Sequence, residues 1–254
     1  MRHLILSDIH SNNEALSAVL KHANGRYDRI LCLGDLVGYG SDPNEIVDWV
    51  RDVMPADGTA TDPRVIRGNH DKACCGLDSI EDFNPAAQAS SLWTSDTLTE
   101  ENLLFLRGLT QGPVDAGGFD LVHGAPSDED EYIITADDAA GMYEHLRTGL
   151  TFFGHTHLQG GFFFRRPVVK AIEKVPAKWT ELTISIDENS SFLINPGSVG
   201  QPRDNDWRAA YAIYESDDRL VTYYRVEYDV AEARRRILDA GLPVILGDRL
   251  LVGR

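Results

Sequence analysis

The sequence predicts an α/β protein in which short buried strands alternate with helices. Apolar runs of strand length at residues 3–6 and 30–33 are each followed by a polar turn and then by the spacing of an amphipathic helix. Strand patterns at residues 119–122 and 150–153 also end in polar clusters. Beyond residue 160, strand patterns follow one another, which predicts a second, mainly antiparallel sheet.

Length and composition predict a single domain over residues 1–254. The chain has 254 residues, 43% of them hydrophobic, which is enough to bury a substantial core. The formal net charge of −16 argues against long nucleic acid as a partner, because clustered Lys and Arg bind phosphate backbones. A small anionic substrate is compatible with this charge if bound cations reverse its sign locally.

The cysteines and the N-terminal residues bear on the compartment. Cys74 and Cys75 are adjacent and Cys32 lies in a predicted strand, so no disulfide framework is expected. The first apolar run stops at Ser7, too soon for a signal peptide, and no stretch has transmembrane length. We therefore expect a cytoplasmic protein without a membrane partner.

Capping residues mark the first helix starts. Ser11 with Glu14 forms a capping box for the first helix. Asp42 as cap and Pro43 at the first helical position begin the second. A brief third strand is predicted at residues 64–66.

Residues 74–112 change to a mainly helical character. Asn84 and Pro85 begin one predicted helix, and Thr99 begins another that ends at Gly108. This segment either covers the core or forms a flap over the site. We expect a covering segment that also helps to shape the pocket.

The second half of the chain is mostly strands. A helix is predicted near residues 137–147, and Asp229 caps a last helix that ends near Gly241. A tight loop at residues 195–200 interrupts the strands. The predicted strands are residues 162–164, 182–186 and 191–194, followed by a hairpin of residues 211–214 and 220–226.

Polar side chains follow the predicted strands, at the sheet edge where ligands collect in α/β proteins. The motifs Asp-x-His and His-x-His place alternate side chains so that both can reach one point. Either motif alone is more often a surface turn, but their joint occurrence at strand ends indicates a metal site. The candidates are Asp8, His10, Asp35, Asn69, His70, His123, His155 and His157.

Imidazole and carboxylate ligands together suit manganese, iron, cobalt, nickel or zinc. Asp35 follows the buried run at residues 30–33, and its two carboxylate oxygens can bridge two ions, which an imidazole cannot do without losing its second proton. Two ions roughly 3.5–4 Å apart clamp a phosphate and lower the pKa of a bridging water. We therefore expect two divalent metal ions, manganese first among them, around Asp35.

Five motifs occur in a characteristic order: Asp8-Ile9-His10, Gly34-Asp35, Gly68-Asn69-His70-Asp71, His123-Gly124 and Gly154-His155-Thr156-His157. This order resembles that of the calcineurin-like metallophosphoesterase family. Residues 8–12, 34–40 and 195–200 are similar to its small bacterial and archaeal YfcE-like branch. The resemblance covers nearly all of the first two-thirds of the chain and implies a sandwich of two β-sheets flanked by helices.

The resemblance also implies roles for the matching residues. One ion would be held by Asp8, His10, Asp35 and His157, and the other by Asp35, Asn69, His123 and His155. His70 would protonate the leaving oxygen or stabilise the transition state. Related phosphatases orient that histidine with an acidic residue soon after Gly-Asp. Residues 36–39 contain none here, and Asp71 is a candidate instead.

Substrate contacts are less clearly marked. Asn12, Arg67, Arg203 and Arg208 could meet a phosphate or its ester group, although an exposed arginine is more often solvated. The loop at residues 195–200 either faces the site or is a turn that the second sheet requires.

The resulting hypothesis is a phosphodiesterase of small substrates, in which a metal-bridging hydroxide attacks phosphorus in line. A dinucleoside polyphosphate hydrolase or a phosphomonoesterase is the alternative within this class. A catalytically silent binding module of the same fold is the non-enzymatic alternative. Such a module would show lost ligands, whereas all eight positions are filled here.

Overall fold

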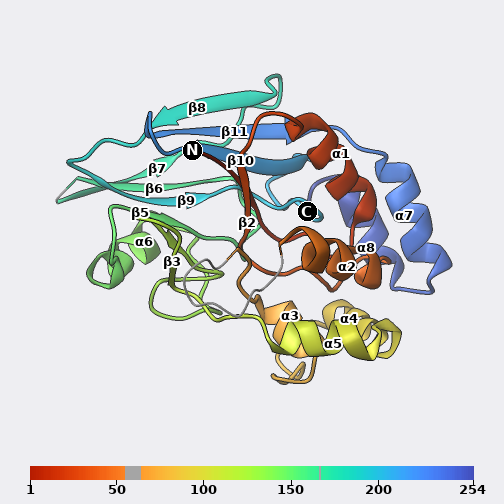
Figure 1. Ribbon diagram of the computed structural model, residues 1–254. Helices are drawn as coiled ribbons and strands as arrows, with labels where there is room; N and C mark the ends of the chain where they lie inside the picture. Colours follow the sequence, from red (N-terminus) through yellow and green to blue (C-terminus); the bar gives the residue numbers. More distant parts are fainter. Residues whose placement is uncertain (55–63, 166) are drawn as a thin grey trace.

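The computed structural model describes residues 1–54, 64–165 and 167–254. Within them, the strands form two mixed sheets that pack together, with helices on the outer sides (Figure 1). The first sheet has the order β2-β1-β10-β11-β8, with β1 Arg2–Leu6, β2 Arg29–Cys32, β8 Glu181–Ser185, β10 Ala209–Glu215 and β11 Leu220–Val226. The second has the order β3-β4-β5-β9-β6-β7, with β3 Val114–Asp115, β4 Asp120–Leu121, β5 Leu150–Phe152, β6 Gly160–Arg165, β7 Val168–Ile172 and β9 Ser191–Asn195. The α/β sandwich is therefore confirmed.

Strand pairing does not divide into a parallel sheet followed by an antiparallel one, so that expectation is wrong. β1 pairs in parallel with β2 but antiparallel with β10, and β5 pairs in parallel with both β4 and β9. Residues 64–66 form no extended strand: Val65 makes an isolated bridge with Cys32, and Ile66 makes one with Thr110. Side-chain alternation identifies a strand but not its partner, because the partner is decided by contacts between residues that are far apart in the sequence.

The helices among the described residues are α1 Asn13–Ala23, α2 Pro43–Val53, α3 Asn69–Cys74, α4 Pro85–Thr97, α5 Glu100–Arg107, α6 Ala136–Met142, α7 Val230–Asp239 and α8 Val244–Leu250. α6 continues into a 3-10 turn at Tyr143–His145, and α8 follows α7, which is therefore not the last helix. Across these same ranges, none of the helices has the length and apolar character that a membrane span requires.

The first helix begins one residue later than the capping box predicts. The Asn12 side chain, rather than that of Ser11, accepts a hydrogen bond from the backbone N–H of Ala15. Ser11 instead has a left-handed backbone, with φ of 51°. The predicted caps of α4, α5 and α7 all accept hydrogen bonds from backbone N–H groups in the first turn, whereas the Asp42 side chain of α2 makes no such bond.

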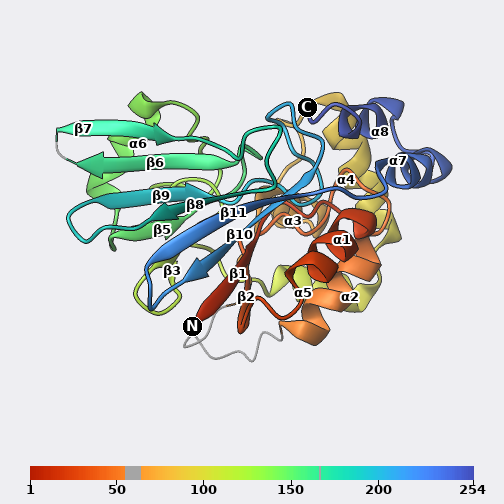
Figure 2. The same cartoon turned by 90° about the horizontal axis from the view of Figure 1, so that it is seen from above.

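Alternation along β1 divides the apolar interior into layers. Leu4 and Leu6 belong to the cluster formed with α1, α2, α7 and α8, whereas Ile5 belongs to the cluster between the two sheets. Figure 2 shows these four helices together on one side of the molecule, away from α6. α6 covers the second sheet through contacts such as that of Ala139 with the cluster around Phe162. Burial of an aliphatic side chain stabilises by about 1.5–3 kcal/mol, so this packing holds the strand ends in place.

His3 offers a test of the packing between the sheets. Its ring centroid lies 5.1 Å from that of Phe119 and 6.1 Å from that of Tyr214. Burial, assisted by Arg29, lowers the pKa of His3 to about 4. The unfolded chain takes up this proton near pH 6.5. Between about pH 6.5 and 4 the unfolded state therefore binds more protons, and the free energy of unfolding should fall as the pH falls.

We expect His3→Phe to lose less stability than the wild type when urea unfolding is compared at about pH 7 and pH 4.5. The phenyl ring keeps the aromatic packing but has no group that titrates. His145→Gln is a matched control, because His145 is exposed. Equal losses in the wild type and His3→Phe would contradict the buried neutral state of His3.

Candidate metal centre

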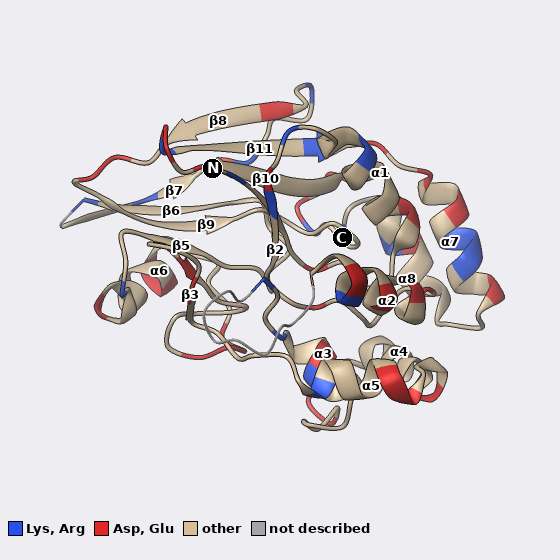
Figure 3. Cartoon of the chain, in the orientation of Figure 1, with Lys and Arg blue, Asp and Glu red and all other residues tan. Residues whose placement is uncertain are grey.

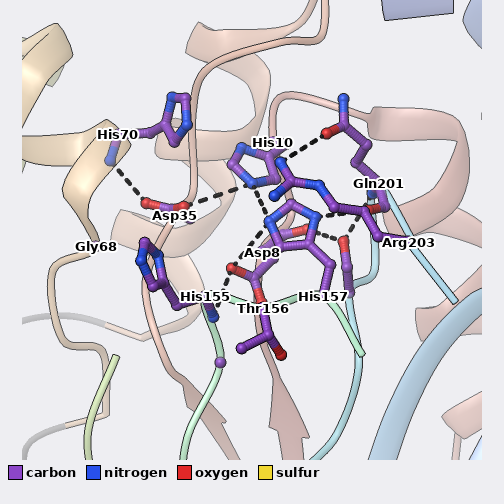
Figure 4. A network of polar contacts seen from close by, with 12 residues as sticks. Asp8, His10, Asp35, Gly68, His70, His155, Thr156, His157, Gln201 and Arg203 are labelled. Atoms are coloured by element: carbon purple, nitrogen blue, oxygen red, sulfur yellow. Dashed lines mark hydrogen bonds and ion pairs between the residues drawn. The ribbon is translucent and has the colours of Figure 1, made fainter. Parts of the chain in front are cut away.

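The candidate ligands gather where the carboxyl ends of two parallel strand pairs meet. Asp8 and His10 follow β1, and Asp35 follows β2. His123 follows β4, and the histidines of the Gly154-His-Thr-His157 motif follow β5. Asn69 and His70 begin α3, which starts close to Asp35 because the His70 backbone N–H donates to Asp35 Oδ1 at 2.9 Å. Figure 4 shows Asp8, His10, Asp35, His70, His155 and His157 together.

Two buried clusters share one carboxylate. Their potential ligand atoms lie within 4.8 Å of one another in each cluster. The first cluster is Asp8, His10, Asp35 and His157, and the second is Asp35, His123 and His155. Asn69 joins the second, because its Oδ1 lies 3.2 Å from His123 Nε2. The structure thus brings together all the residues that the sequence nominates as ligands, with Asp35 between the two groups.

The histidines of the first cluster fit a cation. His10 Nδ1 donates to the carbonyl of Val37 at 2.9 Å, and His157 Nδ1 donates to that of Gln201 at 2.6 Å. Each Nε2 therefore carries a lone pair, and the two Nε2 atoms lie only 3.0 Å apart. Burial lowers the pKa of both histidines well below the usual range, so a proton does not separate them. Asp8 Oδ2 is also buried and has no hydrogen-bond partner. Buried polar atoms normally have a partner, and a metal ion would provide one here.

The second cluster shows the same demand for positive charge. His123 Nδ1 donates to the Leu33 carbonyl at 2.8 Å, which turns Nε2 toward Asp35 Oδ2, 3.5 Å away. Burial opposes protonation of His123, yet Asp35 and Asp8 raise its pKa to about 10. The two carboxylates thus favour positive charge at this position. His155 donates from Nε2 to the Asp130 carbonyl at 3.0 Å, which leaves Nδ1 for a metal ion.

Five of the candidate ligands have a left-handed backbone. The φ values are 53° for Asp8, 49° for His10, 53° for Asp35, 63° for His155 and 60° for His157. This conformation costs roughly 1–2 kcal/mol for each non-glycine residue. Backbone strain that clusters in this way is typical of functional sites, where the surrounding structure enforces it.

Glycines and Asp71 hold the strained loops. A Cβ on Gly68 would lie 2.5 Å from the Asp35 backbone nitrogen, so only glycine fits there, and one on Gly154 would lie 2.0 Å from Ser7 Oγ, so that side chain would have to move. The Asp71 carboxylate accepts hydrogen bonds from the backbone N–H groups of Asp35, Leu36, Val37 and Gly68 at 2.9–3.2 Å. Asp71 therefore positions the Asp35 loop, and the His70 imidazole finds a different neighbour.

That neighbour is Tyr39, which sequence reasoning missed. His70 Nε2 lies 3.0 Å from the Tyr39 hydroxyl oxygen, and Arg203 donates to the same oxygen at 3.2 Å. The Arg203 guanidinium also lies over the Tyr39 ring, 5.6 Å from its centroid. Burial lowers the pKa of His70 to about 4. The only signal in the sequence was a tyrosine between two glycines in the loop that carries Asp35, at Gly38 and Gly40.

The other predicted substrate contacts differ in their surroundings. Arg203 lies beside His10 and His157 (Figure 4). Asn12 is buried, where it caps α1 and donates to the Gly200 carbonyl at 2.8 Å. The remaining two form ion pairs: Arg67 with Glu129 at 2.8 Å, and Arg208 with Asp206 at 2.6 Å.

The loop at residues 195–200 ties the ligand loops together. Ser198 Oγ and the Gly200 N–H both donate to the Asp8 carbonyl, at 2.8 and 3.0 Å. Asn195 Nδ2 donates to the Gly154 carbonyl at 2.9 Å. The loop thus links the segment after β1 to the segment after β5, and so holds the two ligand-bearing segments together.

The calcineurin-like phosphoesterase superfamily domain matches residues 1–219, and the chain belongs to this family. It is 36% identical to an uncharacterized protein of Methanocaldococcus jannaschii, over 98% of this chain and 97% of that protein. It is 40% identical to a metallophosphoesterase from Sphaerobacter thermophilus whose crystal structure is known. The two structures match over 100% of this chain and 99% of that protein, with a TM-score of 0.84. A hypothetical protein from Pyrococcus horikoshii shares the fold, with 19% identity, a TM-score of 0.78 and coverage of 100% and 98%. The chain is thus a member of the metallophosphoesterase superfamily with buried clusters that could hold metal ions.

Metal loading should stabilise the folded chain, because the clustered lone pairs lack a partner without it. At a Mn²⁺ concentration 100 times the dissociation constant, the free energy of unfolding should rise by about 2.7 kcal/mol for each occupied site over that in a chelator. Asp35→Asn should lose most of this gain, whereas Asp96→Asn, at an exposed position of α4, should keep it. Calorimetric melting of the three proteins with Mn²⁺ and with EDTA measures the effect, and an equal gain in Asp35→Asn would contradict the shared carboxylate.

The left-handed backbone can be tested separately from metal binding. Both His157→Gly and His157→Ala remove the imidazole, but glycine accepts the φ of 60° without strain. In metal-free protein we therefore expect the glycine variant to be more stable by about 1 kcal/mol in urea unfolding. At Leu104, an exposed residue within α5, the order should reverse, because glycine is a poor helix former. A more stable alanine variant at position 157 would refute the strain.

Proposed function

We propose that the chain is a two-metal hydrolase of phosphate esters, with small phosphodiesters as its substrates. The observation that carries the proposal is the sharing of Asp35 by two buried clusters whose lone pairs face one another. Membership of the metallophosphoesterase superfamily supports it. The mixed nitrogen and oxygen donors suit Mn²⁺, and three buried free cysteines suit the reducing cytoplasm.

Each ion would have its own ligands in addition to Asp35. The first would be held by Asp8, His10 and His157, and the second by Asn69, His123 and His155. When bound, two such ions clamp the phosphate and make a nucleophile available from water near neutral pH. The carbonyls that accept from the Nδ1 atoms of His10, His123 and His157 keep these rings oriented before any ion binds.

His70 would assist departure of the alcohol. Its backbone N–H donates to Asp35, but His70 belongs to neither ligand cluster and lines the cleft beside them, so it would remain available to the substrate. With its pKa lowered to about 4 by burial, the free imidazole is neutral at physiological pH and acts as a hydrogen-bond donor to the leaving oxygen. Arg203 supplies a fixed positive charge beside His10 and His157, where it can contact the phosphate (Figure 4).

Hydrolysis of bis(4-nitrophenyl) phosphate tests the proposal. EDTA should abolish turnover and Mn²⁺ should restore it. His70→Ala should lower kcat by about 100-fold, the usual cost of removing one hydrogen-bond donor to developing negative charge, with the Mn²⁺ content unchanged by atomic absorption. Tyr39→Phe keeps the ring and removes only the hydroxyl, so its kcat should fall more for alkyl esters, which are poor leaving groups, than for 4-nitrophenyl esters. His145→Gln, at an exposed position, should match the wild type.

Full turnover in a demetallated sample would overturn the two-metal mechanism. Full metal occupancy without turnover on any phosphate ester would instead indicate a binding module. Loss of bound Mn²⁺ in His70→Ala would show that His70 is a ligand rather than a donor to the leaving group.

A further inference from the structure

A cleft of about 350 Å³ opens beside the candidate metal centre. Its inner end is lined by Asn69, His70 and His155, which belong to the centre. Its outer part is lined by residues of the loop between α3 and α4 and of the loop after β4. Because His70 lines the cleft and would face the leaving oxygen, the group that fills the cleft is the alcohol part of the ester.

Aromatic rings extend from the histidines along the cleft. The Phe83 ring centroid lies 4.7 Å from that of His70, and the Tyr132 ring centroid lies 3.9 Å from that of His155. Tyr39 also lines the cleft. Tyr132 is 46% exposed, so part of its ring remains accessible to a ligand. Aromatic walls of this kind suit an apolar group or an organic cation.

Carboxylates decide between these two possibilities. Asp78, Asp82 and Asp130 line the cleft, and acidic residues mark the loop after α3 (Figure 3). Lys72 pairs with Asp78 at 3.4 Å and with Asp130 at 2.6 Å. No ion pair involves Asp82 within residues 1–54, 64–165 and 167–254, and its side chain is exposed to solvent. The outer cleft therefore carries excess negative charge, opposite in sign to the metal-binding end.

We propose that this cleft selects phosphate esters of alcohols that carry a quaternary ammonium group. This inference rests on the proposed function, since it assigns the phosphate to the metal centre. The cation would lie at the outer end of the cleft beside Phe83 and Asp82, where a ring and a carboxylate both attract it. A second phosphate would meet the same carboxylates and be repelled, which disfavours dinucleoside polyphosphates.

Three phosphonates test the selection without hydrolysis, because their C–P bond is not cleaved. (2-Trimethylammonioethyl)phosphonate carries the cation, 3,3-dimethylbutylphosphonate is its neutral isostere, and 2-carboxyethylphosphonate carries an anion. Calorimetric titration into the Mn²⁺-loaded protein should show binding about fivefold tighter for the cation than for its isostere, the effect of one charge pair at about 4 Å in water. The anion should bind more weakly than either.

Asp82→Asn should remove most of the preference for the cation and leave the affinity for the neutral isostere unchanged. Asp96→Asn is the matched control, an exposed carboxylate of α4 outside the cleft lining. The preference should also weaken as salt is raised from about 0.01 to 0.15 M, because the cleft is open to solvent.

Equal binding of cation and isostere, or an unchanged preference in Asp82→Asn, would overturn the proposal. Such a result would not affect the proposed hydrolysis, which is measured separately on bis(4-nitrophenyl) phosphate. Conversely, if the protein prefers the cation but shows no turnover on any phosphate ester, the proposed hydrolysis is refuted and the proposed selectivity of the cleft is supported.

Discussion

The structure depends on an electrostatic conflict around Asp35. Unprotonated Nε2 atoms of His10 and His157 face each other at 3.0 Å, and carboxylates of Asp8 and Asp35 lie beside them in a buried site. Buried acceptors without donors are costly, so such an arrangement persists only where the fold enforces it and a cation can resolve it. The pKa of His123, raised to about 10, is a second sign of the same conflict, because the charges of Asp35 and Asp8 outweigh the effect of burial.

Much of the fold around the site serves to maintain this arrangement. Each sheet contributes parallel strands whose carboxyl ends point to the same place. The Asp71 carboxylate accepts hydrogen bonds from backbone N–H groups of the Asp35 loop. The loop at residues 195–200 links the segment after β1 to the segment after β5 through hydrogen bonds. Left-handed residues then direct the side chains inward. The ligands are thus preorganised by backbone contacts, and an ion would bind without rearrangement of the loops.

The charge distribution explains how a chain of net charge −16 could act on an anion. The inner end of the site has Arg203 and places for two cations, whereas the outer cleft has carboxylates. A substrate with a phosphate at one end and a cation at the other matches both ends. The same polarity would repel a polyanion, so on the proposed function the acidic composition would contribute to selectivity rather than oppose binding.

The sequence by itself determined the fold class, the family and the set of side chains that gather at the strand ends. The fold class and the side chains follow from local features, namely an apolar run, a polar turn, and residue types that suit a metal ion, whereas the family follows from the resemblance of the ordered motifs. It did not determine that Asn12 rather than Ser11 caps α1, because that depends on the left-handed turn after His10. Only the tertiary structure placed Tyr39 beside His70, engaged Arg67 with Glu129 and assigned the last strands to the first sheet. Those contacts join residues that are distant along the chain, so no local pattern encodes them.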